Sequence, residues 1–151
     1  QGALHNPADR DHCLQYMVAV ALLFGDLKAE HYEDKTASDP RIDKLREMMT
    51  VSENKQFSAD YHDPEKRSIA NSIRLHFTDG SSSELVTVEY PIGHKRRRDE
   101  GVKVLMNKFA RNLKTRFSEE QTLNIINAHK DIKELGNMSV TNYMELWIPM
   151  R

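Results

Sequence analysis

The sequence has little of what marks fibrous, disordered, secreted or membrane proteins. Among its 151 residues only 6 are glycine and 5 are proline, which excludes collagen-like and low-complexity chains. A lone cysteine, Cys13, cannot form an internal disulfide and favours a reducing compartment. The longest apolar run, residues 17–24, is far shorter than the roughly 20 residues of a membrane span, and no signal-peptide pattern opens the chain. We therefore expect a cytoplasmic protein with no membrane partner.

An excess of charge of one sign is also lacking, because 22 basic and 23 acidic side chains leave a formal net charge of -1. This balance argues against a protein whose whole surface binds nucleic acid. Hydrophobic residues make up 38% of the chain and charged residues 30%, which is typical of one folded domain of this length.

Helical signals dominate the first third of the chain. Asn6 is a favoured N-cap and a proline follows it, which predicts a helix over 7–24 that ends at a left-handed Gly25. Residues 17–24 are apolar on every face of this helix, so we expect that half to be buried all round. Helical spacing of apolar residues predicts a second short helix over 40–49.

The period of the pattern changes in the middle of the chain. Apolar and polar residues alternate over 73–78 and again over 85–90, and Asp79-Gly80 lies between the two runs. This arrangement is typical of a β-hairpin. A further strand is expected at 57–61.

The last third of the chain returns to helical spacing. It predicts an amphipathic helix of about four turns over 102–113. Ser118 and Gln121 fit a capping box, which predicts a helix from there to Gly136. A short last helix is expected to begin at Ser139 or Thr141 and to end at Leu146. The expected fold class is α+β, with a small antiparallel sheet and flanking helices.

One candidate site lies on the first predicted helix. His12 and Tyr16 stand four residues apart and would share a face of that helix. A buried polar group must find a partner, so two interpretations stay open. Either both side chains bond to neighbouring backbone, or they line a cleft in which Tyr16 is a hydrogen-bond donor or acid.

The second candidate site is the basic run that follows Gly93. Arginine offers a rigid fork that binds carboxylates or phosphates, and short basic runs also occur in nucleic-acid patches. Because Asp99 and Glu100 follow directly, a solvated or interface loop is the ordinary alternative. The seven histidines form no metal-binding pattern, and the chain has no glycine-rich phosphate loop.

Four segments, in this order, resemble the C-terminal third of members of the MmgE/PrpD family, and together they cover most of residues 4–115. The segments are NPADRDHCLQY at 6–16, DPEKRS at 63–68, EYPIGHKRRR at 89–98 and KFARNL at 108–113.

The resemblance implies a two-domain enzyme with a large helical domain and a smaller α+β lid. It assigns residues 3–117 to the lid and 118–151 to a helical segment that returns to the missing N-terminal helical domain. Gln1 and Gly2 are then expected to be a cloning remnant. The full-length enzyme is expected to be a homodimer in the cytoplasm, or in the mitochondrial matrix of a eukaryote. Without that domain, the tail is expected to expose four apolar side chains: Tyr143, Leu146, Trp147 and Ile148.

The resemblance also implies a reaction, the elimination of water from the small tricarboxylate 2-methylcitrate in propionate breakdown. The family needs no metal and no organic cofactor. A sister activity of the family decarboxylates a similar tricarboxylate. Tyr16 and His12 match motif residues and are the expected catalytic groups. The expected substrate-binding residues are basic: His94, Arg96, Arg97 and Arg98.

A different class of function is the alternative to an enzyme. On that hypothesis the chain is a module whose basic loop binds nucleic acid or acidic partners, and its binding to DNA would fall steeply with salt. On the enzyme hypothesis the 151 residues alone are inactive, because most acid–base groups lie upstream, and nucleic acid is no partner.

Overall fold

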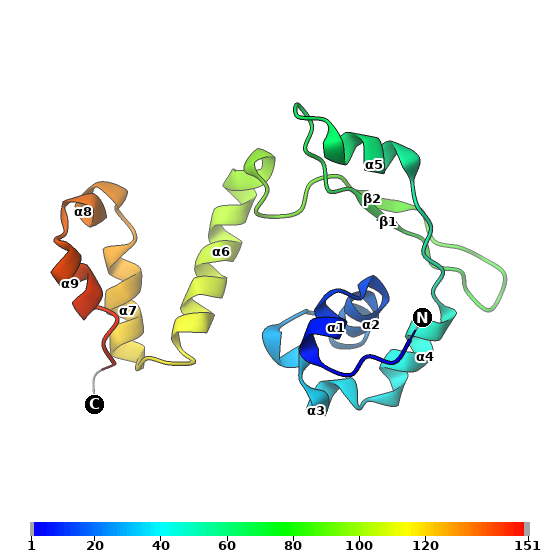
Figure 1. The fold of residues 1–151 in the computed structure, drawn as a ribbon, viewed down its shortest axis with the longest axis horizontal. Coiled ribbons are helices and arrows are strands. Elements are labelled where there is room, and N and C mark those ends of the chain that lie inside the picture. The colour runs from blue at the N-terminus through cyan, green and yellow to red at the C-terminus, as the bar shows by residue number, and fades with distance from the viewer. Residues whose placement is uncertain (1, 150–151) are drawn as a thin grey trace. The chain divides into compact units, whose positions relative to one another are not determined.

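The computed structural model describes residues 2–149 (Figure 1). It is mainly helical with one two-stranded antiparallel sheet, which confirms the predicted α+β class. The chain divides into two compact units, Gln1–Asn54 and Lys55–Arg151. The predicted division after residue 117 concerns the domains of a longer enzyme and stays a prediction. Gln1 and residues 150–151, which belong to that prediction, lie outside the described residues.

The first unit is helical. It contains α1 (Pro7–Asp11), α2 (Leu14–Phe24), the 3-10 turn η1 (Ala29–Tyr32), α3 (Asp34–Ala37) and α4 (Pro40–Met48). Helix α2 packs against α4. Their contact forms the core of the unit, in which Ile42 of α4 meets three buried side chains of α2, Tyr16, Ala19 and Val20.

The single helix predicted over 7–24 is wrong, because the structure has a break at His12–Cys13. Asn6 caps α1 as expected, since its Oδ1 accepts a hydrogen bond from the Asp9 N–H at 2.9 Å. The backbone of Cys13 is extended (φ -102°, ψ 103°), and α2 begins at the next residue. The His12 ring bonds the Ala8 carbonyl at 2.9 Å, in the way that a histidine at a helix C-terminus satisfies a free carbonyl. Gly25 ends α2 in the left-handed region as predicted (φ +73°).

The prediction that residues 17–24 are buried on all sides is also wrong. The packed side of α2 faces α4, whereas Leu22 and Phe24 are exposed. The reason is size, because a unit of about fifty residues has too few elements to cover a helix on every face.

The second unit contains the sheet and the remaining helices. Its elements are α5 (Lys55–His62), β1 (Asn71–Ile73), β2 (Val86–Val88), the 3-10 turn η2 (Lys95–Arg97), α6 (Arg98–Leu113), α7 (Glu119–Ala128), α8 (Ile132–Asn137) and α9 (Val140–Glu145). The strand expected at 57–61 is wrong, because these residues lie inside α5. A helical contact between Gln56 and Asp60, Nε2 to Oδ1 at 2.7 Å, spans that segment.

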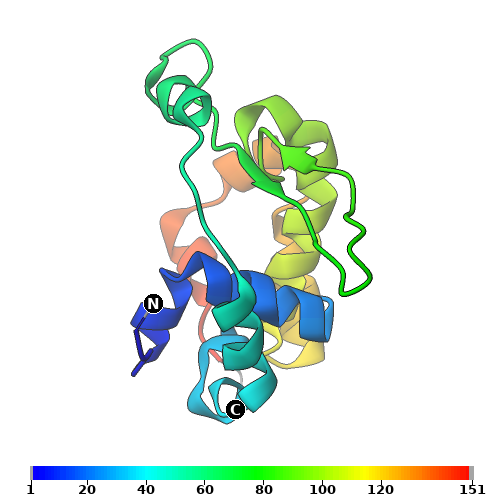
Figure 2. The same cartoon turned by 90° about the vertical axis from the view of Figure 1, so that its right-hand side faces the viewer.

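The predicted hairpin is confirmed, but its strands are shorter than the predicted runs over 73–78 and 85–90, and the first strand begins two residues earlier. Asn71 pairs with Val88 and Ile73 with Val86, and all residues of both strands are exposed. A long loop joins the strands (Figures 1 and 2). In it Gly80 has φ +85°, as the expected turn requires.

The C-terminal helices begin at the caps that the sequence predicts. The Oγ of Ser118 accepts from the Gln121 N–H at 3.2 Å, and that of Ser139 accepts from the Asn142 N–H at 3.1 Å. The helix predicted to run to Gly136 is instead divided into α7 and α8, because Asp131 caps a new start. The Gln121 side chain donates to the carbonyls near the chain's end rather than completing a capping box.

Aromatic side chains pack together where α6, α7 and α9 meet. The rings of Phe117, His129 and Tyr143 lie within 6.0 Å of the Trp147 ring, centroid to centroid. The expected exposure is therefore wrong for Tyr143, Leu146 and Trp147, which are all half-buried, whereas Ile148 is exposed as predicted. Within residues 2–149 no helix has both the length and the apolarity to cross a bilayer.

Candidate active site

Tyr16 is held by α2 with only 2% of its surface exposed. Its hydroxyl donates a hydrogen bond to the His31 carbonyl at 2.6 Å, and its ring stacks with Tyr32, with centroids 6.2 Å apart. Burial raises the pKa of Tyr16 above its usual value, so the hydroxyl keeps its proton at neutral pH. These contacts agree with the first of the two interpretations, in which the side chain bonds to neighbouring backbone. The catalytic role of Tyr16 stays a prediction.

His12 lies in the break between α1 and α2, and its side chain is 83% exposed. Its Nδ1 lies 2.9 Å from the Ala8 carbonyl and 2.5 Å from Oδ1 of Asp11. The bond to the Ala8 carbonyl, together with that to Asp11, raises the pKa of His12. A histidine that holds its proton more readily suits an acid. His12 and Tyr16 do not share a helix face, so that prediction is wrong.

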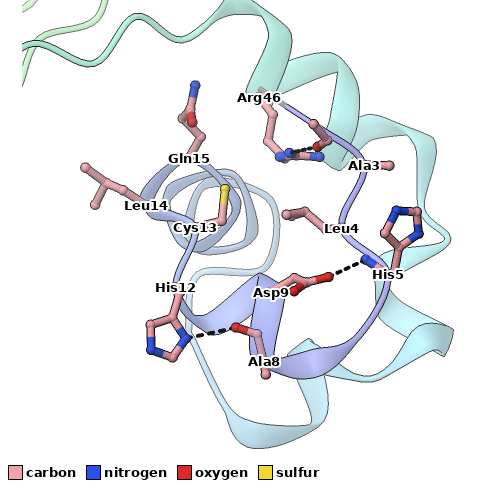
Figure 3. Close-up of a pocket in the computed structure, with 11 residues that line it drawn as sticks. Ala3, Leu4, His5, Ala8, Asp9, His12, Cys13, Leu14, Gln15 and Arg46 are labelled. Atoms are coloured by element: carbon pink, nitrogen blue, oxygen red, sulfur yellow. Dashed lines mark hydrogen bonds between the residues drawn. The ribbon is translucent and has the colours of Figure 1, made fainter.

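An open hollow of about 760 Å³ lies beside His12 (Figure 3). Eleven described residues line it, and Tyr16 is not one of them. Asp9 accepts a hydrogen bond from the His5 N–H at 2.9 Å at one wall. At another wall, Arg46 forms an ion pair with Asp43 of α4 and donates a hydrogen bond to the Gly2 carbonyl at 3.0 Å. The Nε of Arg46 is buried without a hydrogen-bond partner among the described residues. The hollow therefore offers a guanidinium, imidazoles and a carboxylate.

The predicted basic residues form one turn, which we call the basic turn (residues 94–98). It consists of His94, η2 and the first residue of α6. His94 caps η2, since its Nδ1 accepts from the Arg96 N–H at 3.2 Å. Its ring also packs on Tyr90, with centroids 4.6 Å apart. His94 is thus engaged in holding the turn.

Two arginines of the basic turn bond to the fold itself. The Arg96 guanidinium lies 5.1 Å from the centre of the Tyr90 ring and donates to the Glu65 carbonyl. Arg97 donates to the Tyr90 carbonyl at 2.8 Å, and its Nε and Nη2 bind the Glu100 carboxylate at 3.0 and 2.7 Å. This pairing raises the pKa of Arg97 and lowers that of Glu100.

The basic turn approaches the helix that follows it through two glycines. Gly93 has φ +106°, a conformation that glycine adopts without strain. A Cβ placed on the buried Gly101 of α6 would lie 3.2 Å from the Gly93 backbone nitrogen. A side chain at either position would therefore disturb the turn.

The structure brings His94, Arg96, Arg97 and Arg98 together in the second unit, whereas Tyr16 and His12 lie in the first. Sequence reasoning missed Arg46 and the other charged walls of the hollow, because they follow no motif or period. Within residues 2–149, no cluster of three or more histidine, cysteine, aspartate or glutamate side chains is arranged to hold a metal ion.

Comparison with known proteins identifies relatives over the whole chain. The family model of the MmgE/PrpD C-terminal domain matches residues 1–134. The 2-methylcitrate dehydratase of Escherichia coli (strain K12) is 53% identical over 148 residues, which are 98% of this chain and 31% of that protein. The 2-methylcitrate dehydratase of Cupriavidus necator is 52% identical over 146 residues, 97% of this chain and 30% of that protein.

A eukaryotic relative matches almost as well. The protein named mitochondrial 2-methylcitrate dehydratase of Yarrowia lipolytica is 49% identical over 148 residues, 98% of this chain and 28% of that protein. The chain thus spans about a third of the length of the curated relatives it matches.

Proposed function

Because this chain belongs to the MmgE/PrpD family, we propose that it is the C-terminal part of a 2-methylcitrate dehydratase. The observation that carries the proposal is the identity of 53% across 98% of the chain to a protein of that name. The reaction is the elimination of water from 2-methylcitrate to give 2-methylaconitate, a step of propionate breakdown, and the enzyme is a hydro-lyase.

The elimination needs a base, an acid and cations. The base removes a proton from carbon, and the electron pair of the broken C–H bond forms the C=C bond. The hydroxyl takes a proton from the acid and leaves as water. In this chain we assign the acid role to Tyr16 or His12. The raised pKa of His12 favours its protonated form near neutral pH, and the Tyr16 hydroxyl carries a proton that it can donate. The basic turn binds substrate carboxylates. The base comes from the N-terminal part of the longer enzyme, and the proposal includes no cofactor.

The partner of this chain is the N-terminal helical domain of the same protein. We assign residues 3–117 to the lid over that domain and 118–151 to the segment that returns to it, in an enzyme that is a homodimer. The exposed apolar side chains of α2, such as Leu14 and Leu22, support a covering partner. The location is the cytoplasm, or the mitochondrial matrix in a eukaryote, since the Yarrowia lipolytica relative is named as a mitochondrial protein.

The test is an assay of the full-length protein and of residues 1–151 with 2-methylcitrate, with the product identified by mass spectrometry. We expect the full-length protein to lose water from the substrate and the 151 residues alone to be inactive. Loss of carbon dioxide instead of water would assign the sister activity of the family. The absence of any turnover by the full-length protein would contradict the proposal.

A nucleic-acid module is the weaker candidate. The formal net charge is -1, and two arginines of the basic turn already bond within the fold. Retention of the protein on DNA at physiological salt would support the nucleic-acid hypothesis.

A further inference from the structure

The arginines of the basic turn differ in how many of their donors are free. Arg97 uses Nε and both terminal nitrogens, on the Glu100 carboxylate and the Tyr90 carbonyl. Arg96 donates to the Glu65 carbonyl and covers one face of the Tyr90 ring. A guanidinium binds a carboxylate through a pair of parallel N–H donors. Arg97 has given its Nε–Nη2 pair to Glu100, and Arg96 has one donor on a carbonyl and one face of its guanidinium on a ring, so both are already engaged within the fold.

Lys95 and Arg98 are in the opposite situation. Both are exposed, and the described residues provide neither side chain with an ion pair or a hydrogen bond. They stand three residues apart across η2, and side chains at this spacing lie on the same side of a 3-10 turn. The turn therefore presents two unpaired cations side by side.

The unpaired charge of Arg98 also opposes the stability of α6. Arg98 is the first residue of α6, a helix of 16 residues, and a positive charge is unfavourable at a helix N-terminus. Asp99 and Glu100 offset part of this charge, and Glu100 is itself paired with Arg97. An unpaired cation at this position departs from a local rule of helix stability, and departures of this kind are expected at functional sites.

We infer that the basic turn divides its residues into two roles, in which Arg96 and Arg97 position the turn while Lys95 and Arg98 bind two carboxylates of the tricarboxylate substrate. The inference rests on the proposed function and narrows it to named side chains. Arg96 and Arg97 are positioning residues, since they act through the placement of Lys95 and Arg98. Gly93 and Gly101 complete this support, because their close approach fixes where the turn meets α6.

Positioning matters because a cation binds a carboxylate strongly only at the right distance and angle. The bond of Arg96 reaches back to the loop after α5, and those of Arg97 reach back to Tyr90, two residues after β2, and forward to α6. The turn is thus tied to three separate segments of the second unit. Loss of one tie would displace Lys95 and Arg98 without removing either charge.

The experiment is a double-mutant cycle in the full-length enzyme with 2-methylcitrate. The variants are Arg98→Gln, Arg97→Gln, the double variant and Arg98→Lys, and the matched control is Lys114→Gln, which removes a surface cation and its ion pair with Glu119. We expect Arg98→Gln to raise KM about tenfold or more, the typical effect of losing a charge-assisted hydrogen bond, and to leave the unfolding midpoint unchanged or higher. Arg98→Lys should recover most of the affinity, and the control should change nothing.

The double variant decides the positioning role. If Arg97 acts through its neighbours, Arg97→Gln raises KM and lowers the unfolding midpoint. Its further effect on KM in the Arg98→Gln background is then smaller than its effect in the wild type, because only the placement of Lys95 is left to disturb. Additive effects on KM would overturn the positioning role, and a KM within twofold of wild type for Arg98→Gln would overturn the binding role.

A second measurement separates this inference from the proposed function. If the wild-type full-length protein turns over no 2-methylcitrate, the proposed function fails, and binding of citrate to the same variants is measured by calorimetry. Weaker citrate binding by Arg98→Gln but not by Lys114→Gln supports the assigned roles. Equal citrate affinity of wild type and Arg98→Gln overturns them.

Discussion

The two units treat their candidate residues in opposite ways. In the first unit two dissimilar side chains, His12 and Tyr16, were predicted on one face and are separated by a helix break into an exposed and a buried position. In the second unit the arginines of the basic turn lie together, but the side chains of Arg96 and Arg97 form hydrogen bonds within the fold, whereas that of Arg98 forms none with the described residues. The comparison teaches that the partners of a side chain, rather than its type or spacing, decide what it is free to do.

The largest expected effect concerns the core that fixes Tyr16. Ile42 is fully buried against α2, so Ile42→Ala leaves a cavity and should lower the free energy of unfolding by about 2–5 kcal/mol. Leu22→Ala removes the same kind of side chain from the exposed side of α2 and should cost less than about 1 kcal/mol. Urea unfolding of both variants of residues 1–151 alone, where Leu22 is exposed, checks this. Equal losses would mean that the two sides of α2 are covered alike.

Tyr16→Phe tests which of its two interpretations holds. Removal of the hydroxyl leaves the His31 carbonyl without its donor, which should cost about 1–3 kcal/mol of stability. In the full-length enzyme, a catalytic Tyr16 should also lower kcat by about 100-fold or more. Loss of stability with near-normal turnover would leave Tyr16 a structural residue and assign the acid role to His12.

Substitutions of glycine sharpen the comparison in the second unit. Gly101→Ala should destabilise the protein by about 1 kcal/mol, because the added Cβ meets the Gly93 backbone and only part of this strain is offset by better helix propensity. Gly136→Ala in α8 meets no atom within 4 Å and should stabilise by up to about 1 kcal/mol. Thermal unfolding of the two variants should therefore shift in opposite directions. A stabilised Gly101→Ala would show that the approach of the turn to α6 is loose.

The smallest expected effect is a change with pH at His12. Its pKa is raised by its bonds to Ala8 and Asp11, so its protonated form stabilises the folded state. This contribution is fully present below the ordinary histidine pKa of about 6.5 and is lost as the pH rises through the higher folded value. An NMR titration should show a lower His12 pKa in Asp11→Asn, and no change in Asp131→Asn, where asparagine can still cap α8. An unchanged value in Asp11→Asn would remove Asp11 as a cause.

Features that depend on neighbouring residues were predictable from the sequence. Asn6, Ser118 and Gly25 mark helix ends because each acts within three or four residues of itself. The break before α2 was not predictable, since it depends on the ring of His12 bonding the Ala8 carbonyl in place of a continuing helix. The role of Arg96 depends on a carbonyl 31 residues away, which no local pattern reports.

The shortness of the two strands has a consequence for how the protein behaves at high concentration. Within the described residues, β1 and β2 pair with each other alone, so each strand has an outer row of free backbone groups. Beside these edges lie exposed apolar side chains, Ile73, Val86 and Val88. Edges of this kind recruit other chains when they are long and flat. Strands of three residues offer another molecule too few consecutive groups for a stable register, so the brevity of the hairpin protects the protein from edge-to-edge aggregation.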